Sequence, residues 1–74
     1  MLAGGYALKQ IRKEAGLTQK DVARHLGITQ PTVSYLEDRY AEARVSTLKR
    51  YCEAIGAELT ITIATNDGKT YALL

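Results

Sequence analysis

The pattern of apolar and polar residues changes once along the chain, at about Gly56. Before this glycine, apolar residues recur every three or four positions, as on one face of an amphipathic helix. After it, apolar and polar residues alternate, as in a strand with one buried face. The pattern predicts one domain of 74 residues, with a helical bundle over residues 6–56 and a β-hairpin over residues 57–74.

The first helix is expected over residues 6–15. Three of its apolar residues share one face: Leu8, Ile11 and Ala15. We expect residues 1–5 to be a frayed start, because the pair Gly4–Gly5 disfavours a helix.

A fourth helix is expected over residues 47–55, after a polar loop at residues 38–45. Ser46 is placed to cap this helix, and Gly56 is placed to end it. Its apolar stripe consists of Leu48, Tyr51, Cys52 and Ile55. Because Cys52 lies on this stripe, we interpret it as a buried small hydrophobic residue rather than as a reactive thiol.

The two middle helices lie close together, within residues 18–37 (TQKDVARHLGITQPTVSYLE). Thr18 is a good N-cap for the first of them, and Gly27 can adopt the left-handed conformation that ends it. Thr29 is placed to cap the second, and Pro31 lies in its first turn, where a missing N–H is not needed. The segment therefore predicts a helix-turn-helix unit.

The spacing of small and apolar residues is the most specific feature of this unit. Two helices that cross steeply need a small residue where they touch, and Ala23 is such a residue. The second helix needs apolar residues that face the first, and Val33 and Leu36 are placed for this. The alternative is an ordinary helical hairpin in a core, which does not require the caps, the glycine and the apolar residues in this register.

Residues 17–37 (LTQKDVARHLGITQPTVSYLE) resemble the helix-turn-helix of the lambda-repressor-like, Xre-type regulators, and the resemblance extends from about Leu8 to Gly56. It implies a mainly α fold, a four-helix bundle whose third helix enters the major groove of double-stranded DNA. With the C-terminal β-hairpin, the expected class is α+β. The resemblance also implies a structural ion pair between Arg12 and Glu37, which would lock the first helix against the third.

Base reading is assigned by this resemblance to the start of the third helix and to a position one turn later. Gln30 can form two hydrogen bonds to adenine, whereas Pro31 can only pack and Thr32 can offer a hydroxyl or a methyl group. Tyr35 projects one turn later, toward a base edge or a phosphate. The full expected base-reading set is Gln30, Pro31, Thr32, Ser34 and Tyr35.

Contacts with phosphates position such a protein on DNA. Gln19 matches a glutamine that binds the DNA backbone in the family, and the amides at the start of its helix add a favourable dipole. Further candidates, each equally compatible with simple solvation, are Thr29, Arg39, Arg44, Ser46 and Thr47.

Beyond Gly56, residues 58–65 (ELTITIAT) and 69–73 predict two strands, joined by the strong turn signal Asn66–Asp67–Gly68. Many Xre-type domains have a fifth helix here. A strand or hairpin in its place resembles a subset of the family, the small antitoxins of type II toxin–antitoxin operons, which repress their own promoter.

The hairpin is also the expected dimerisation element. Two strands are too few to be stable alone, and they leave two edges unpaired. Two copies related by a two-fold axis would join these edges, space their recognition helices about 34 Å apart and require a palindromic operator. The apolar face buried in this way consists of Leu59, Ile61, Ile63, Tyr71 and Leu73. In the alternative, the hairpin folds back onto its own helices in a monomer.

Charge is distributed unevenly along the chain, which has ten basic and eight acidic residues and a net charge of +2. Only Lys69, Glu58 and Asp67 follow Gly56, so nine basic and six acidic residues lie before it. The helical part therefore carries the positive excess that a phosphate-binding surface needs. A single cysteine allows no intrachain disulfide, and without a recognisable signal peptide or membrane span we expect the cytoplasm.

Catalysis has little support in the sequence. The single histidine, His25, has no cysteine or histidine partner at metal-binding spacing, and we expect it on the surface. There is no glycine-rich phosphate loop, nucleophile elbow or pair of carboxylates in a catalytic pattern. We therefore expect no catalytic residues, no metal and no cofactor.

The leading functional hypothesis is a homodimeric, sequence-specific DNA-binding repressor, the autoregulating antitoxin of a toxin–antitoxin operon. One alternative is a phage-type repressor or restriction controller without a toxin partner. Another is a protein-interaction module that chiefly neutralises a toxin, with DNA binding secondary.

Overall fold

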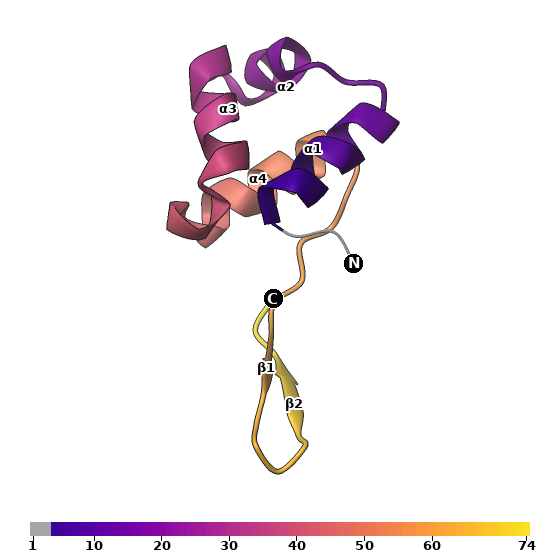
Figure 1. Cartoon of the computed structure of the whole chain (residues 1–74), viewed down its shortest axis with the longest axis vertical. Coiled ribbons are helices and arrows are strands. Elements are labelled where there is room, and N and C mark those ends of the chain that lie inside the picture. Colours follow the sequence, from indigo (N-terminus) through magenta and orange to yellow (C-terminus); the bar gives the residue numbers. More distant parts are fainter. Residues whose placement is uncertain (1–3) are drawn as a thin grey trace.

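The computed structural model describes residues 4–74 as four α-helices, one short 3-10 helix and a two-stranded antiparallel hairpin (Figure 1). In chain order the elements are α1 (Gly4–Glu14), α2 (Gln19–Leu26), α3 (Gln30–Asp38), η1 (Tyr40–Glu42), α4 (Val45–Ala54), β1 (Thr62–Ala64) and β2 (Thr70–Ala72). The helices form a cluster from which the hairpin extends, and the molecule therefore measures 44 × 22 × 19 Å. The predicted bundle followed by a hairpin is confirmed.

A small apolar core lies between α2, α3 and α4. Its buried residues are Val22, Ala23, Leu26, Val33, Leu36, Tyr51 and Ile55. Leu8 of α1 and Leu17 and Ile28 of the turns pack against this cluster while remaining partly exposed. The predicted roles of Ala23, Val33 and Leu36 as buried contacts of the helix-turn-helix are confirmed.

Each helix of the helix-turn-helix has the predicted N-cap. The Thr18 hydroxyl accepts a hydrogen bond from the Asp21 amide, and the Asp21 carboxylate accepts one from the Thr18 amide, which forms a reciprocal capping box. Thr29 accepts from the Thr32 amide at the start of α3. Between them, Gly27 has a φ of 70°, the left-handed conformation that ends α2.

Helix α1 differs from the prediction at its start. It includes Gly4 and Gly5, which were expected to lie outside it. A glycine in a helix interior costs about 1 kcal/mol relative to alanine, and the cost is tolerated here because both glycines occupy the first turn. Residues 1–3 of the expected frayed start lie outside the described residues. Of the three residues predicted to share the apolar face, Leu8 packs against the core, Ile11 is exposed, and Ala15 is exposed just beyond the end of α1.

The start of α4 also differs from the prediction. The helix begins at Val45 after an extended Arg44, whose carbonyl accepts the first hydrogen bonds, so Ser46 lies within the first turn and does not cap it. Within the expected loop, residues 40–42 form the 3-10 helix η1, and α4 begins three positions after it, at Val45. At the other end, Gly56 with a φ of 78° follows the helix, as predicted.

The hairpin is built around a tight turn from Thr65 to Gly68. The Gly68 amide donates to the Thr65 carbonyl at 3.1 Å, and Gly68 has a φ of 88°. The strands are shorter than predicted, because regular pairing is limited to three residues on each side, with Ile63 opposite Tyr71. Every residue of both strands is exposed and the hairpin projects away from the helices (Figure 1), so the alternative in which it folds back is wrong.

Candidate nucleic-acid interface

The start of α3 presents one polar, exposed face. Gln30, Pro31 and Thr32 are all exposed, whereas Val33 and Leu36 on the other side of the helix are buried. A helix with this division keeps its first turn available to a ligand while its inner face holds it to the bundle. Three of the five predicted base-reading residues therefore lie together on the outer surface.

A shallow hollow connects α3 with the start of α2. It is lined by Gln19, Gln30, Pro31 and Ser34. The structure therefore brings together three of the predicted base-reading residues and the glutamine predicted to bind the DNA backbone. The arrangement offers two side-chain amides and a hydroxyl, which can both donate and accept hydrogen bonds.

Gln19 is held by a partner that the sequence did not indicate. Its side-chain nitrogen donates to Oε1 of Glu37 at 2.9 Å, so one of its two N–H groups is engaged inside the protein. The side-chain oxygen and the second N–H are not used by this bond, and they can still contact a ligand in the hollow.

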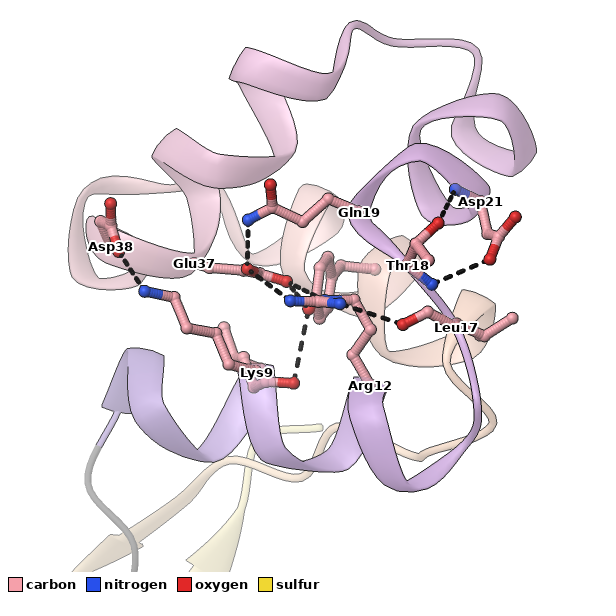
Figure 2. Close-up of polar contacts among 10 residues, drawn as sticks. Lys9, Arg12, Leu17, Thr18, Gln19, Asp21, Glu37 and Asp38 are labelled. Carbon is pink, nitrogen blue, oxygen red and sulfur yellow. Dashed lines mark hydrogen bonds and ion pairs between the residues drawn. The ribbon is translucent and has the colours of Figure 1, made fainter.

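The ion pair between Arg12 and Glu37 is buried. Arg12 Nε lies 2.7 Å from Glu37 Oε2, and the two residues are 6% and 0% exposed. Arg12 also donates to the Leu17 carbonyl at 3.0 Å, which ties the end of α1 to the turn before α2. The pair therefore fixes three segments relative to each other, which is the structural role expected from the family resemblance (Figure 2).

Tyr51 of α4 completes this buried network. Its hydroxyl donates to Glu37 Oε2 at 2.5 Å. Burial raises the pKa of Glu37, but hydrogen bonds from Arg12, Tyr51 and Gln19 outweigh it, so this pKa lies below its ordinary value. Burial and the bond to Glu37 together raise the pKa of Tyr51 well above its ordinary value. Glu37 is therefore a carboxylate bound by one residue from each of the other three α-helices.

The remaining predicted base-reading residue, Tyr35, lies at a second polar cluster next to η1. Tyr35 is 58% exposed, and its hydroxyl donates to Oε2 of Glu42 at 3.0 Å. Arg39, a predicted phosphate contact, forms an exposed ion pair with the other carboxylate oxygen of Glu42 at 3.5 Å. The bond to Glu42 raises the pKa of the Tyr35 phenol.

The other predicted phosphate contacts divide into two places. The Thr29 hydroxyl is engaged in the cap of α3 and lies 2.7 Å from the Thr32 hydroxyl. Arg44 and Ser46 are exposed at the start of α4, and Thr47 next to them is half-buried. The cluster at the start of α4 is separate in sequence from α2 and α3, and its exposure is compatible with a phosphate contact.

Sequence reasoning missed the partners that orient these residues. Asp21 was detectable, because an acidic residue three positions after an N-cap threonine is a capping signal. Tyr51 was assigned to the apolar stripe, and nothing in its spacing distinguishes a tyrosine whose hydroxyl has a buried acceptor. Glu42 and the exposed ion pair between Lys9 and Asp38 at 2.8 Å depend on the turn geometry of η1 and on helix packing.

Residues 4–74 contain no group of three or more histidine, cysteine or acidic side chains arranged to hold a metal ion. Within the same residues, no helix is both long and apolar enough to span a bilayer.

Comparison with known proteins identifies the class. A helix-turn-helix family model matches residues 8–61, and the chain belongs to this family, which is of the Xre type. The chain is 40% identical over 57 residues to antitoxin HigA1 of Mycobacterium tuberculosis, in both the CDC 1551 / Oshkosh and H37Rv strains. The match covers 77% of this chain but only 38% of HigA1, so the chain spans well under half of that relative.

Two solved structures are similar over nearly the whole chain. One is a DNA-bound antitoxin HigA3, with 34% identity and a TM-score of 0.78, covering 100% of this chain and 94% of that one. The other is a HigA antitoxin described as bending DNA through a unique dimerization, with 35% identity and a TM-score of 0.75, covering 99% and 95%. The similarity therefore includes the C-terminal hairpin as well as the helix-turn-helix.

Proposed function

We propose that this protein is a sequence-specific double-stranded DNA-binding repressor that acts through α3 in the major groove. The observation that carries the proposal is the exposed first turn of α3, with Gln30, Pro31 and Thr32, where Gln30 and Pro31 line one hollow together with Gln19. A major groove admits one α-helix, and the residues at the start of a recognition helix contact base edges. The positive excess before Gly56 supports attraction to phosphates.

In this proposal the phosphate contacts come from the start of α2, the cap of α3 and the segment that follows α3. Gln19 contributes the amide groups left free by Glu37, and the exposed cations Arg39 and Arg44 lie after α3. Thr29, Ser46 and Thr47 add hydroxyl groups. The role is binding rather than catalysis, and regulation of a promoter would place the protein in the cytoplasm.

The proposal includes a homodimer formed by residues 57–74, with residues 6–56 of the same domain binding DNA. Ile63 and Tyr71 lie opposite each other, and Ile61 and Leu73 continue on the same side, since alternate residues share a face. Of these, Ile63, Tyr71 and Leu73 are 47%, 53% and 64% exposed, and Leu59 is half-buried just before them. Burying this face between two copies would remove apolar surface from water, which stabilises the dimer by about 0.025 kcal/mol for each Å² buried.

The biological setting that we propose is a toxin–antitoxin operon, in which the protein represses its own promoter and pairs with a toxin. The support is the similarity to HigA antitoxins, in sequence to HigA1 and in structure to the DNA-bound HigA3. The hairpin, in place of a fifth helix, supports the same setting.

The test is binding of the full chain to the DNA upstream of its own gene, measured by fluorescence anisotropy with and without the neighbouring gene product. We expect saturable binding that a shuffled duplex of equal composition does not show. We also expect the neighbouring product to change this binding and to be neutralised by the protein in a growth assay. Equal affinity for the shuffled duplex would contradict sequence-specific repression, and an inert neighbour would leave a repressor without a toxin partner.

A further inference from the structure

Glu42 holds two residues of the proposed interface at once. One carboxylate oxygen accepts from the Tyr35 hydroxyl at 3.0 Å and the other lies 3.5 Å from Arg39 Nη1. All three side chains are more than half exposed, so the cluster lies on the outer surface beside α3. Short-range structure fixes it, because η1 begins directly after Arg39 and the Glu42 amide donates to the Arg39 carbonyl.

This arrangement restricts the chemistry that Tyr35 can offer to another molecule. A phenol has one proton to donate and oxygen lone pairs with which to accept, whereas a carboxylate only accepts. The hydroxyl proton must therefore lie between Tyr35 and Glu42. What remains on the exposed side of the Tyr35 oxygen is a lone pair.

In the major groove, an acceptor distinguishes between bases. Adenine N6 and cytosine N4 carry amino groups that donate, whereas guanine O6 and thymine O4 are acceptors. An oxygen whose proton is directed elsewhere can accept a hydrogen bond from the amino group of adenine or cytosine. Opposite guanine O6 or thymine O4, it would leave two acceptors facing each other. Such an unmatched polar contact is disfavoured because both groups lose water without gaining a hydrogen bond.

We propose that Glu42 fixes Tyr35 as a hydrogen-bond acceptor, so that this tyrosine selects a base with an exocyclic amino group, adenine or cytosine, at its step of the operator. The inference rests on the proposed function, in which α3 lies in the major groove. Glu42 has a second effect in the same proposal, because its negative charge lies near the phosphates and engages Arg39. It lowers affinity for all DNA sequences while it sharpens the choice at one base.

The experiment starts from a selection of bound duplexes from a randomised library by the wild-type full chain and by Tyr35→Phe. The base pair of the operator at which the two proteins differ in base preference is the one that Tyr35 contacts, and it is called the Tyr35 step. There, adenine is replaced by the purine nucleoside without the amino group, or cytosine by 2-pyrimidinone. We expect the amino deletion to weaken wild-type binding about three- to tenfold more than binding by Tyr35→Phe, as for one hydrogen bond. Any weakening of base pairing is common to both proteins and cancels.

Two substitutions at Glu42 separate orientation from charge. Glu42→Gln keeps a carbonyl acceptor for the Tyr35 proton, so it should keep the amino preference while binding all duplexes more tightly. Glu42→Ala frees the hydroxyl to donate or accept, and should lose the preference. The matched control is Glu53→Ala, which removes one exposed negative charge from α4 and should leave the preference unchanged.

Each result has a distinct meaning. An amino deletion that weakens wild type and Tyr35→Phe equally would overturn the assignment of Tyr35, as would an unchanged preference in Glu42→Ala. A wild-type protein that enriches no sequence from the library would overturn the proposed function, and this inference with it. Selection of one sequence with no step sensitive to Tyr35 would overturn the inference alone.

Discussion

Tyr51 and Glu37 are joined by a hydrogen bond of 2.5 Å that connects α4 to the end of α3, across 14 positions of sequence. Arg12 of α1 and Gln19 of α2 bind the same carboxylate. Through this one side chain, the orientation of α3 depends on every other α-helix. The exposed first turn of α3 is therefore held by a buried polar network at its other end (Figure 2).

Tyr51→Phe should destabilise the fold by about 1–3 kcal/mol, because it leaves a buried carboxylate oxygen short of one donor. Glu37→Gln should cost more, about 3–5 kcal/mol, because it leaves the Arg12 charge buried without its partner. Urea unfolding of each variant measures both. The matched control is Lys9→Ala, which breaks an exposed ion pair and should leave the unfolding midpoint nearly unchanged. A Tyr51→Phe variant as stable as this control would show that the bond contributes nothing.

The same network gives stability a defined pH window. The pKa of Glu37 is lowered on folding, so its contribution is fully present above the ordinary value of 4.5 and is lost as the pH falls below it. The pKa of Tyr51 is raised, so its contribution is fully present below the ordinary value of 10.0 and is lost as the pH rises above it. Unfolding free energies across this range should decline at both ends. Tyr51→Phe should flatten the alkaline decline selectively, and an unaltered decline in that variant would contradict the assignment.

Much of the helix-turn-helix was predictable because its signals are local. Thr18, Gly27 and Thr29 each act through the backbone within a few residues, and all three have the predicted roles. The ion pair of Arg12 and Glu37 was accessible only through the family resemblance, since 25 positions separate the two residues.

What the sequence did not predict depends on how the helices and the turn before α4 pack in space. The hydroxyl of Tyr51 could be placed only once α3 and α4 were packed. The 3-10 helix η1 was not foreseen, and neither were the earlier start of α4 and the hydrogen bond from Tyr35 to Glu42. The strands were predicted too long, because the alternation of side chains indicates which face of a strand is apolar but not where regular pairing ends.

Gln30→Ala should lose discrimination at one base pair of the operator by about 1–3 kcal/mol, because a bidentate contact with adenine would be removed. Affinity for unrelated DNA should change little. Competition binding with operators substituted at each position measures this. Thr32→Ser, in the same turn, keeps the hydroxyl but removes the methyl group, and we expect it to reduce discrimination less than Gln30→Ala does. A Gln30→Ala variant that binds its operator as well as wild type would show that α3 does not contact bases as proposed.

Arg39→Ala and Arg44→Ala should weaken binding to every sequence alike, because phosphate contacts carry no sequence information. Each should also reduce the slope of log K against log salt by about 1, as fewer counterions are released. The measurement is a salt titration of binding to operator and non-operator duplexes. Lys69→Ala removes a cation from the hairpin turn and serves as the control, with an unchanged slope expected. Loss of sequence preference in either arginine variant would contradict a phosphate role.

Dimerisation through the hairpin can be tested with the same substitution placed on one face of the strand pair or on the other. Ile63→Lys and Tyr71→Lys place a charge on the apolar face, whereas Thr62→Lys and Ala72→Lys place the same charge on the opposite face of the same strand pair. If the apolar face joins two copies, the first pair should run as monomers in sedimentation and bind the operator much more weakly, since two linked recognition helices contribute jointly to affinity. The second pair should remain dimeric with near wild-type binding. Truncation after Ala57, which keeps the packed end of α4, should give the same monomer. A truncated chain or an Ile63→Lys variant that remained dimeric would place the dimer interface elsewhere on the molecule.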